Sequence, residues 1–306
     1  MNAAPRKSSR SQSPLLRIVA ACIAPVFALI AFAARFPQDA ARPALDHPIM
    51  VDSDGPGSKL FALDNWGTLH ELNVTATGLD EFRTISLPST FPASDMSYAD
   101  TNNQESVVVA GIESDRGMVA RYALDGQSLQ TWTFRNLCSG IDVAEDGKSA
   151  YVATSDSKEL YRINLEGTDS VYVASLPNAT KLGPLAFDER HQQIYVADVA
   201  AGAIHQYSLR TKTSKLLVSG LSAPTALSFD RDSGRLYIAD PGRRAIFTID
   251  IAAQKPVVTQ LVATPLKSPY GMALITKDRL AVADYAQDSI FVYSSKGALL
   301  FRYPPK

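Results

Sequence analysis

Residues 235–250 read RLYIADPGRRAIFTID: one apolar run ends on an aspartate, and a second begins after a short basic turn. The motif Tyr237-Ile-Ala-Asp240 has copies along the chain, namely Phe61-Ala-Leu-Asp64, Val108-Val-Ala-Gly111, Tyr151-Val-Ala-Thr154, Tyr195-Val-Ala-Asp198 and Ala281-Val-Ala-Asp284. Successive copies start 42 to 47 residues apart, so the 261 residues from Asp46 to Lys306 divide into six units of 43.5 residues on average. The chain is therefore built from an internal repeat.

Each repeat shows the pattern of four short strands. A turn and an apolar strand precede the motif, as in 222–230, and alternating runs rich in aromatic and β-branched residues follow it, as in 290–293. Four antiparallel strands in about 40 to 45 residues are typical of a propeller blade. The sequence predicts an all-β, six-bladed β-propeller of four-stranded antiparallel blades over 46–306. With a first strand at 49–51 and a last strand at 299–303, the ends would meet between whole blades; a strand borrowed from the other terminus is the alternative way to close the ring.

The recurring aspartate is interpreted as a turn residue. Aspartate ends the motif in four of six copies, with Gly111 and Thr154 in the other two. A catalytic residue is needed once, whereas a turn is needed in every blade. We expect Asp240 to accept hydrogen bonds from backbone N–H groups of the turn that follows it.

The succession of Pro-x-Gly-φ-Ala, φ-Tyr-Val-Ala-Asp and apolar-x-x-aromatic, where φ is an apolar residue, resembles the NHL-type and YVTN-type repeats of six-bladed propellers. The resemblance is clear over 137–303 and weak over 46–105. The same superfamily includes gluconolactonase-like hydrolases, so the resemblance implies the architecture and leaves open whether the protein is an enzyme, a ligand binder or a protein scaffold.

The N-terminal residues indicate export. Residues 1–17 form a basic start, and 18–34 read IVAACIAPVFALIAFAA without a polar interruption. With the small-x-small pattern at 31–33, this run predicts a signal peptide; uncut, it would be a membrane anchor. Cys22 offers a third alternative, a lipid-modified cysteine. Residues 35–45 would be a linker, and each alternative puts the propeller outside the cytoplasm, periplasmic or secreted, with membrane contact only through 18–34.

Charge and cysteine content limit the partners of the body. After residue 38 the chain has 25 basic and 31 acidic residues and no basic stripe, so we expect no nucleic-acid partner. Cys138 is the one cysteine after residue 38, so no disulfide can form within the body. We expect a monomeric body that is stabilised by packing and strand pairing.

The first strand of each blade should line the central channel. Aligning these strands places polar residues at one position near the strand start, with two carboxylates close by. The expected ligand-binding residues at the channel mouth are Ser94, Asp95, Ser139, Asp142, Thr225 and Tyr270, with Trp66 in a loop as a further interface candidate.

A metal site is the alternative for the same channel. The gluconolactonase-like family uses a Glu, Asn and Asp set around a divalent cation, with Asn or Asp directly before the Gly of the Pro-x-Gly turn. Here Tyr270 and Thr225 occupy that slot. Asp95 and Asp142 remain as ligands for Ca²⁺ or another divalent cation.

The sequence carries no assembled catalytic set. It has no Gly-x-Ser-x-Gly elbow and no histidine pair at metal-binding spacing, and we expect His191 and His205 at the surface. The favoured hypothesis is a non-catalytic, cofactor-free extracytoplasmic propeller that binds a protein partner, peptide or small ligand through its loop face or channel. The alternative is a divergent metal-dependent hydrolase of lactones or esters.

Overall fold

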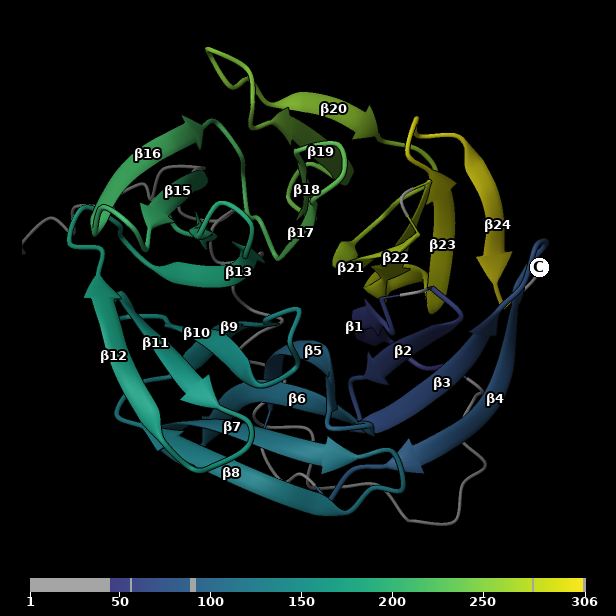
Figure 1. Ribbon diagram of the computed structural model, residues 1–306. Helices are drawn as coiled ribbons and strands as arrows, with labels where there is room; N and C mark the ends of the chain where they lie inside the picture. The colour runs from purple at the N-terminus through teal and green to yellow at the C-terminus, as the bar shows by residue number, and fades with distance from the viewer. Residues whose placement is uncertain (1–44, 56, 89–91, 277, 305–306) are drawn as a thin grey trace, which may run out of the picture. The chain divides into compact units, whose positions relative to one another are not determined.

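The computed structural model describes residues 45–55, 57–88, 92–276 and 278–304. In these residues six four-stranded antiparallel sheets surround a central channel as the blades of a propeller (Figure 1). Strands pair in chain order within each blade, so the first strand is innermost and the fourth outermost. The predicted six-bladed all-β fold is confirmed.

The blades follow one another along the chain. The strands of blades 1 to 3 are β1 (Pro48–Ser53), β2 (Lys59–Asp64), β3 (Thr68–Val74), β4 (Leu79–Ser86), β5 (Ala93–Thr101), β6 (Gln104–Glu113), β7 (Arg116–Ala123), β8 (Ser128–Phe134), β9 (Cys138–Val143), β10 (Ser149–Thr154), β11 (Glu159–Asn164) and β12 (Ser170–Ser175). The strands of blades 4 to 6 are β13 (Leu182–Asp188), β14 (Gln193–Asp198), β15 (Ala203–Ser208), β16 (Thr213–Ser219), β17 (Ala226–Asp230), β18 (Arg235–Asp240), β19 (Ala245–Asp250), β20 (Thr259–Val262), β21 (Pro269–Thr276), β22 (Arg279–Asp284), β23 (Ser289–Ser294) and β24 (Leu299–Tyr303). A short 3₁₀ helix, η1 (Tyr285–Gln287), lies between β22 and β23.

The hydrophobic core is divided into clusters between neighbouring blades. A blade is covered by a neighbour on each face, so its second strand is buried on both faces; in β18, for example, Leu236 to Asp240 are all buried. One cluster joins blades 1 and 6, with Val51 and Leu60 packed against Ile275 and Ala283. Apolar packing at every blade boundary stabilises the ring without a disulfide.

The ring closes between whole blades rather than through a borrowed strand. β1 pairs within blade 1 and β24 within blade 6, so the described strands include no mixed blade. Polar contacts reinforce this boundary: Ser53 Oγ donates to the Leu274 carbonyl at 2.7 Å, and the Arg279 guanidinium donates to the carbonyls of Thr75 (2.8 Å) and Ala76 (3.1 Å). Side-chain contacts close the ring in place of a borrowed strand.

The aspartate that ends the second strand has an architectural role. Asp240 is fully buried; its Oδ2 accepts from Ser222 N at 2.7 Å, and its Oδ1 accepts from Ala223 N at 3.1 Å and Arg243 N at 3.2 Å. Equivalent bonds from the turn before the first strand are accepted by Asp198 and Asp284. The predicted bond to the following turn is present, and the carboxylate also holds the turn that leads into the blade.

One surface prediction fails. His191 is exposed, as expected, with 64% of its side chain accessible. His205 is only 6% exposed, because β15 is the third strand of its blade and is covered by a neighbouring blade. Its Nε2 lies 3.7 Å from Oδ2 of the buried Asp198.

The predicted signal segment, including 18–34 and Cys22, lies outside the described residues. Among the residues that are described, no helix has the length and apolar character to cross a membrane.

Candidate functional site

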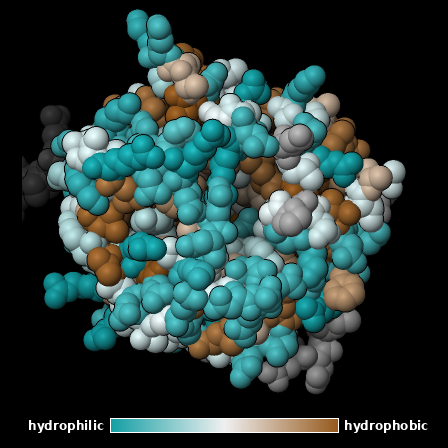
Figure 2. Space-filling model, viewed as in Figure 1, coloured by the Kyte–Doolittle hydropathy of each residue, from teal (hydrophilic) through white to brown (hydrophobic). Residues whose placement is uncertain are grey.

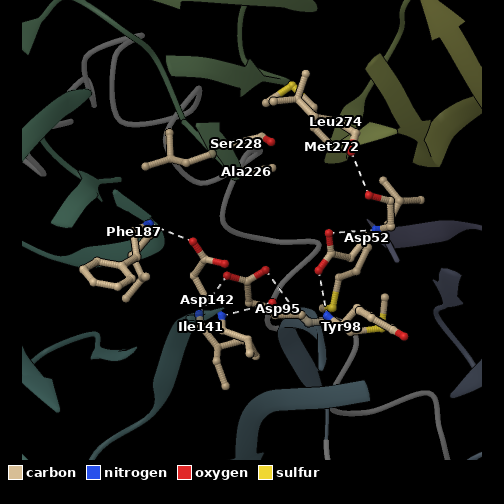
Figure 3. A pocket seen from close by; sticks show the side chains of 18 of the residues that line it. Asp52, Asp95, Tyr98, Ile141, Asp142, Phe187, Ala226, Ser228, Met272 and Leu274 are labelled. Atoms are coloured by element: carbon tan, nitrogen blue, oxygen red, sulfur yellow. Dashed lines mark hydrogen bonds between the residues drawn. The ribbon is translucent and has the colours of Figure 1, made fainter. Parts of the chain in front are cut away.

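The central channel contains a cavity of about 570 Å³ that the innermost strands of the blades line. Its size falls within the range of about 300 to 1,000 Å³ found for small-molecule pockets. Asp52, Asp95 and Asp142 are among its lining residues, and Figure 3 shows their side chains directed into the same space. The cavity therefore has carboxylates on its wall.

Asp52 and Asp142 each form a bond to the next blade. The innermost strand of a blade is a sheet edge, so its backbone N–H groups need acceptors from outside the sheet. Asp52 Oδ2 accepts from Tyr98 N at 2.7 Å, and Asp142 Oδ2 accepts from Phe187 N at 2.7 Å (Figure 3). These bonds join blade 1 to blade 2 and blade 3 to blade 4.

Ser97 holds the same position in blade 2. Asp52, Ser97 and Asp142 each pair with the first motif residue on the second strand of their blade. The Ser97 hydroxyl accepts from Val143 N at 3.2 Å, which is the same kind of inter-blade bond. A neutral hydroxyl therefore suffices for this bond. The inter-blade contact does not require the negative charges of the two aspartates.

Asp95 lies at a different level of the channel. It pairs with Ala110, two positions farther along the partner strand than the residue opposite Ser97. Its Oδ2 accepts from Ile141 N at 2.9 Å, and its Oδ1 accepts from Met96 N at 2.9 Å. Blade 2 therefore contacts blade 3 through both a hydroxyl and a carboxylate.

The carboxyls of Asp52, Asp95 and Asp142 have raised pKa values. Burial raises the pKa of Asp52 to about 6, although N–H donors, the Ser97 hydroxyl and Arg231 act in the opposite direction. Burial likewise raises the pKa of Asp142 to about 7, with a further contribution from the negative charge of Asp52. Burial also holds the pKa of Asp95 well above its usual range, and repulsion from Asp142 and Asp52 adds to the effect. When these carboxyls are ionised, the positive groups around them do not balance their negative charge.

The acidic residues occupy one half of the ring. The positions equivalent to Asp52 and Asp142 hold Ala186, Ser228 and Ala273 in blades 4 to 6. The wall formed by blades 1 to 3 is therefore acidic, and the opposite wall is neutral at the same level. A ligand in the cavity would meet different chemistry on its two sides.

An ion pair spans one end of the channel. Arg231, after β17 in blade 5, lies with its Nη1 2.5 Å from Oε1 of Glu145, after β9 in blade 3. Blade 4 separates these two blades, so the pair crosses the channel mouth rather than a single blade boundary. Both residues line the cavity.

Four of the residues predicted from the sequence line this cavity: Ser94, Asp95, Asp142 and Thr225. Ser94 Oγ lies within hydrogen-bond distance of the carbonyls of Ala110 (3.1 Å) and Cys138, and Thr225 Oγ1 donates to the Tyr270 carbonyl at 2.9 Å. These hydroxyls face the next blade, as the carboxylates do. The cavity thus brings together four of the seven candidates.

The other three candidates lie outside the cavity lining. Ser139 Oγ donates to the Ala153 carbonyl within its own blade at 3.3 Å. Tyr270 packs on the core between blades 1 and 2, its ring centroid 6.2 Å from that of Tyr285, and burial raises its pKa to about 12. Trp66 Nε1 donates to Asp46 Oδ2 at 2.7 Å. Their binding roles stay predictions.

Within the described residues, the predicted metal ligands Asp95 and Asp142 do not belong to a three-residue cluster of converging ligand atoms. In the described part of the chain, one group of three His, Cys, Asp or Glu side chains has its ligand atoms within 4.8 Å of one another, and it consists of Asp46, His47 and Asp288. Asp95 and Asp142 do not belong to it.

Sequence reasoning missed Asp52, Glu145 and Arg231. A signal for Asp52 was present, because it stands in the apolar strand Ile49-Met-Val-Asp52 as Asp142 stands in Gly140-Ile-Asp142. The turn residues Glu145 and Arg231 resemble ordinary loop charges, and only the closed ring brings them together.

The face shown in Figure 2 is mostly hydrophilic. The fold and the cavity together define the protein as a six-bladed propeller whose channel is acidic on one side.

Scans of protein-family models and of curated proteins gave no match. The chain is similar to the crystal structure of a structural genomics protein of unknown function from Bacteroides thetaiotaomicron VPI-5482, with a TM-score of 0.67 and 13% identity, over 86% of this chain and 73% of that chain. It is also similar to a chain in the crystal structure of a nidogen/laminin complex, with a TM-score of 0.66 and 17% identity, over 81% of this chain and 93% of that chain. At such identities the likeness concerns the fold.

Proposed function

We propose that this protein is a non-catalytic binding propeller of the NHL/YVTN type that acts outside the cytoplasm and binds a positively charged ligand in its central channel. The charged group is an amine or guanidinium, carried by a small molecule or by a lysine or arginine side chain of a peptide. One observation carries the proposal. The neutral Ser97 hydroxyl accepts the same kind of inter-blade hydrogen bond that the Asp52 and Asp142 carboxylates accept. The fold therefore does not require the negative charges of these two carboxylates.

The energetic cost of these charges supports a binding role. A buried carboxylate is disfavoured unless a cation or enough donors surround it, and the raised pKa values of Asp52 and Asp142 reflect this cost. Arg231 offsets part of the charge but is itself paired with Glu145. Proteins tolerate such local destabilisation mainly where function uses it. A ligand cation among the carboxylates would recover the lost free energy.

The location outside the cytoplasm rests on the sequence of residues 1–34, whose basic start and apolar run are typical of exported proteins. The similarity of fold to a chain from a nidogen/laminin complex is one reason to include peptides among the ligand sources. Fractionation of the expressing cells checks the location, and recovery of the full chain in the cytoplasmic fraction would contradict it.

Calorimetric titration of the full-length protein tests the channel ligand. The probes are agmatine and n-butylamine as small cations, and Ala-Lys-Ala and Ala-Arg-Ala as peptides, with n-butanol and Ala-Glu-Ala as uncharged and acidic controls. We expect saturable binding of cations, with Asp95→Asn and Asp142→Asn each about tenfold weaker, equivalent to about 1.4 kcal/mol. Asp156→Asn is the matched control, because that side chain is 72% exposed in a loop outside the cavity. Cation binding that survives both channel substitutions would contradict the proposal, as would equal binding of n-butanol.

Affinity should also depend on pH. Because the pKa values of Asp52 and Asp142 are about 6 and about 7, the channel gains negative charge as pH rises through this range. We expect affinity for agmatine to rise between pH 5 and pH 8 and binding to release protons. A pH-independent affinity would argue against ionised carboxylates as the binding groups.

A second candidate function is the divergent lactone or ester hydrolase, with Asp95 and Asp142 holding a divalent cation near Tyr270. The favouring observation is the pKa of Asp142, about 7, which suits a general acid or base at neutral pH. Thermal shift with Ca²⁺, Mg²⁺, Mn²⁺ and Zn²⁺, followed by a lactone hydrolysis assay, tests it. Hydrolysis that needs the cation and is lost in Asp142→Asn would favour the enzyme; no cation-dependent hydrolysis would exclude it.

A further inference from the structure

We propose that Asp46, His47 and Asp288 form a binding site for a divalent transition-metal ion such as Zn²⁺, at the boundary between the first and last blades. Asp46 and His47 directly precede β1, and Asp288 follows η1 in the loop before β23. His47 and Asp288 are 241 residues apart in the chain, so ring closure brings them together. The site is independent of the channel carboxylates.

The ligand atoms already converge. One ligand atom from each of the three side chains lies within 4.8 Å of the others. His47 Nδ1 is 3.1 Å from Asp288 Oδ1, and Asp46 Oδ1 contacts the same nitrogen. Ligand atoms bound tetrahedrally at about 2.0 to 2.2 Å from zinc are separated from one another by roughly 3.3 Å. Small side-chain movements would therefore suffice to admit the ion.

The types of ligand indicate which ion would bind. One imidazole nitrogen and two carboxylate oxygens suit Zn²⁺ and related ions, whereas Ca²⁺ takes six to eight oxygen ligands. Two carboxylates and a neutral imidazole balance a divalent cation without excess charge. The side chains of Asp46, His47 and Asp288 are 22%, 41% and 51% exposed, which leaves room for water at a fourth position.

Neighbouring groups orient the ligands. Trp66 Nε1 donates to Asp46 Oδ2 at 2.7 Å, which leaves Oδ1 of the same carboxylate directed at His47. The Tyr285 ring packs edge-to-face with the His47 imidazole, with centroids 4.7 Å apart. Such outer contacts fix ligand geometry in known metal sites.

The backbone and one unpaired acceptor give further support. His47 and Asp288 both have left-handed backbone conformations, with φ of 49° and 46°, which non-glycine residues adopt at a cost and which collect at functional sites. The amide N of Asn65 donates to the His47 carbonyl at 3.1 Å, while its buried side-chain oxygen has no hydrogen-bond partner in the described residues. The unpaired acceptor thus belongs to a residue whose backbone is bonded directly to the ligand residue His47.

The alternative is an ion pair in which a protonated His47 bridges two carboxylates without a metal. Calorimetric titration of the chelator-treated full-length protein with ZnCl₂ separates the two, with Co²⁺ absorption as a measure of coordination. We expect one Zn²⁺ per chain and visible Co²⁺ bands. His47→Ala and Asp288→Asn should each weaken binding at least about 100-fold, and Trp66→Phe about 10-fold, since outer-contact substitutions in known sites cost about 10- to 100-fold.

Two controls keep the result specific. His191→Ala removes a histidine that pairs with Asp188 at 2.8 Å elsewhere on the surface, and Asp156→Asn removes a 72% exposed carboxylate in a loop away from both sites; both should bind Zn²⁺ as the parent does. Circular dichroism of Asp288→Asn, whose substitution lies on an exposed loop, checks that loss of zinc is not loss of fold. Absence of saturable zinc binding, or binding unchanged in both His47→Ala and Asp288→Asn, would overturn the proposal in favour of the ion pair.

Discussion

Asp142→Asn removes one negative charge from the channel and keeps an oxygen that can accept the Phe187 N–H. In the folded protein the pKa of Asp142 is about 7, against 3.8 for the carboxyl in water. Between these pH values the folded protein holds a proton that the unfolded chain has lost. Stability of the parent therefore falls as pH rises from about 4 to about 7, because the unfolded state binds fewer protons than the folded state. Asparagine cannot ionise, so the variant escapes this loss.

The size of the effect follows from the two pKa values. The pKa difference between 3.8 and about 7 corresponds to about 4 kcal/mol of unfolding free energy, at about 1.36 kcal/mol per pKa unit. Asp142 is partly open to the channel, where water and salt screen its charge, so we expect about 2 kcal/mol. Asp142→Asn should be more stable than the parent by this amount at pH 8, and the advantage should shrink towards pH 5.

Urea unfolding followed by circular dichroism at pH 5, 6, 7 and 8 measures both free energies. Asp125→Asn is the matched control, because Asp125 is an exposed loop residue outside the cavity lining that also accepts a backbone N–H, at 2.9 Å. A variant less stable than the parent at pH 8 would show that the charged form of Asp142 is favoured by the fold. A difference that stays constant with pH would show that its pKa is not raised. Either result would refute the reasoning.

Two further substitutions test the architecture. Asp240→Ala removes an acceptor from three backbone N–H groups of two turns, and we expect urea unfolding to show a loss of about 3 kcal/mol, with a smaller loss in Asp240→Asn and no change in channel binding; a loss near zero would contradict the turn role. Arg279→Ala removes the bonds to the Thr75 and Ala76 carbonyls that join blade 6 to blade 1, and should lower stability by about 1 kcal/mol, whereas Arg244→Ala, at an exposed hairpin position, should have no effect. Equal stabilities of the Arg279 and Arg244 variants would mean that packing alone closes the ring.

The blades could be predicted because each one repeats the same local information. The apolar motif, its terminal aspartate and the turns around it recur in each unit, so the pattern in 235–250 appears in the structure as β18, a turn and β19. The role of Asp240 as a turn residue also followed from repetition. Its bonds to Ser222 and Ala223 did not, because they depend on how the first strand enters the blade.

The channel was predicted less completely because it depends on register and on closure. Ser94, Ser139 and Tyr270 all sit where the first and second strands shift register, as in a β-bulge, and a bulge redirects side chains in ways that sequence alignment does not reveal. Asp95 and Asp142 were predicted together as candidate ligands, but they lie at different levels of the channel.

Long-range contacts account for the residues that were missed. Arg231 of blade 5 and Glu145 of blade 3 form an ion pair although blade 4 lies between their two blades. No local sequence pattern marks either residue as part of the channel. The alternation of apolar and polar residues in its own strand predicts an outward-facing His205, but alternation within one strand does not show that packing between blades buries that strand on both faces. Asp52 lies near the end of β1, past the strand-start position on which the candidates were aligned.

The closure between whole blades has a consequence for chain topology. β24 is the outermost strand of blade 6, and β1 is the innermost strand of the next blade in the ring, blade 1. The same relation holds between β20, the outermost strand of blade 5, and β21, the innermost strand of blade 6, which residues 263–268 connect. A peptide of similar length could join them and turn the sixth boundary into an ordinary blade connection. Circularly permuted chains opened at the turn after β20 should then assemble the same ring, with the order of the blades cyclic and no blade obliged to be first.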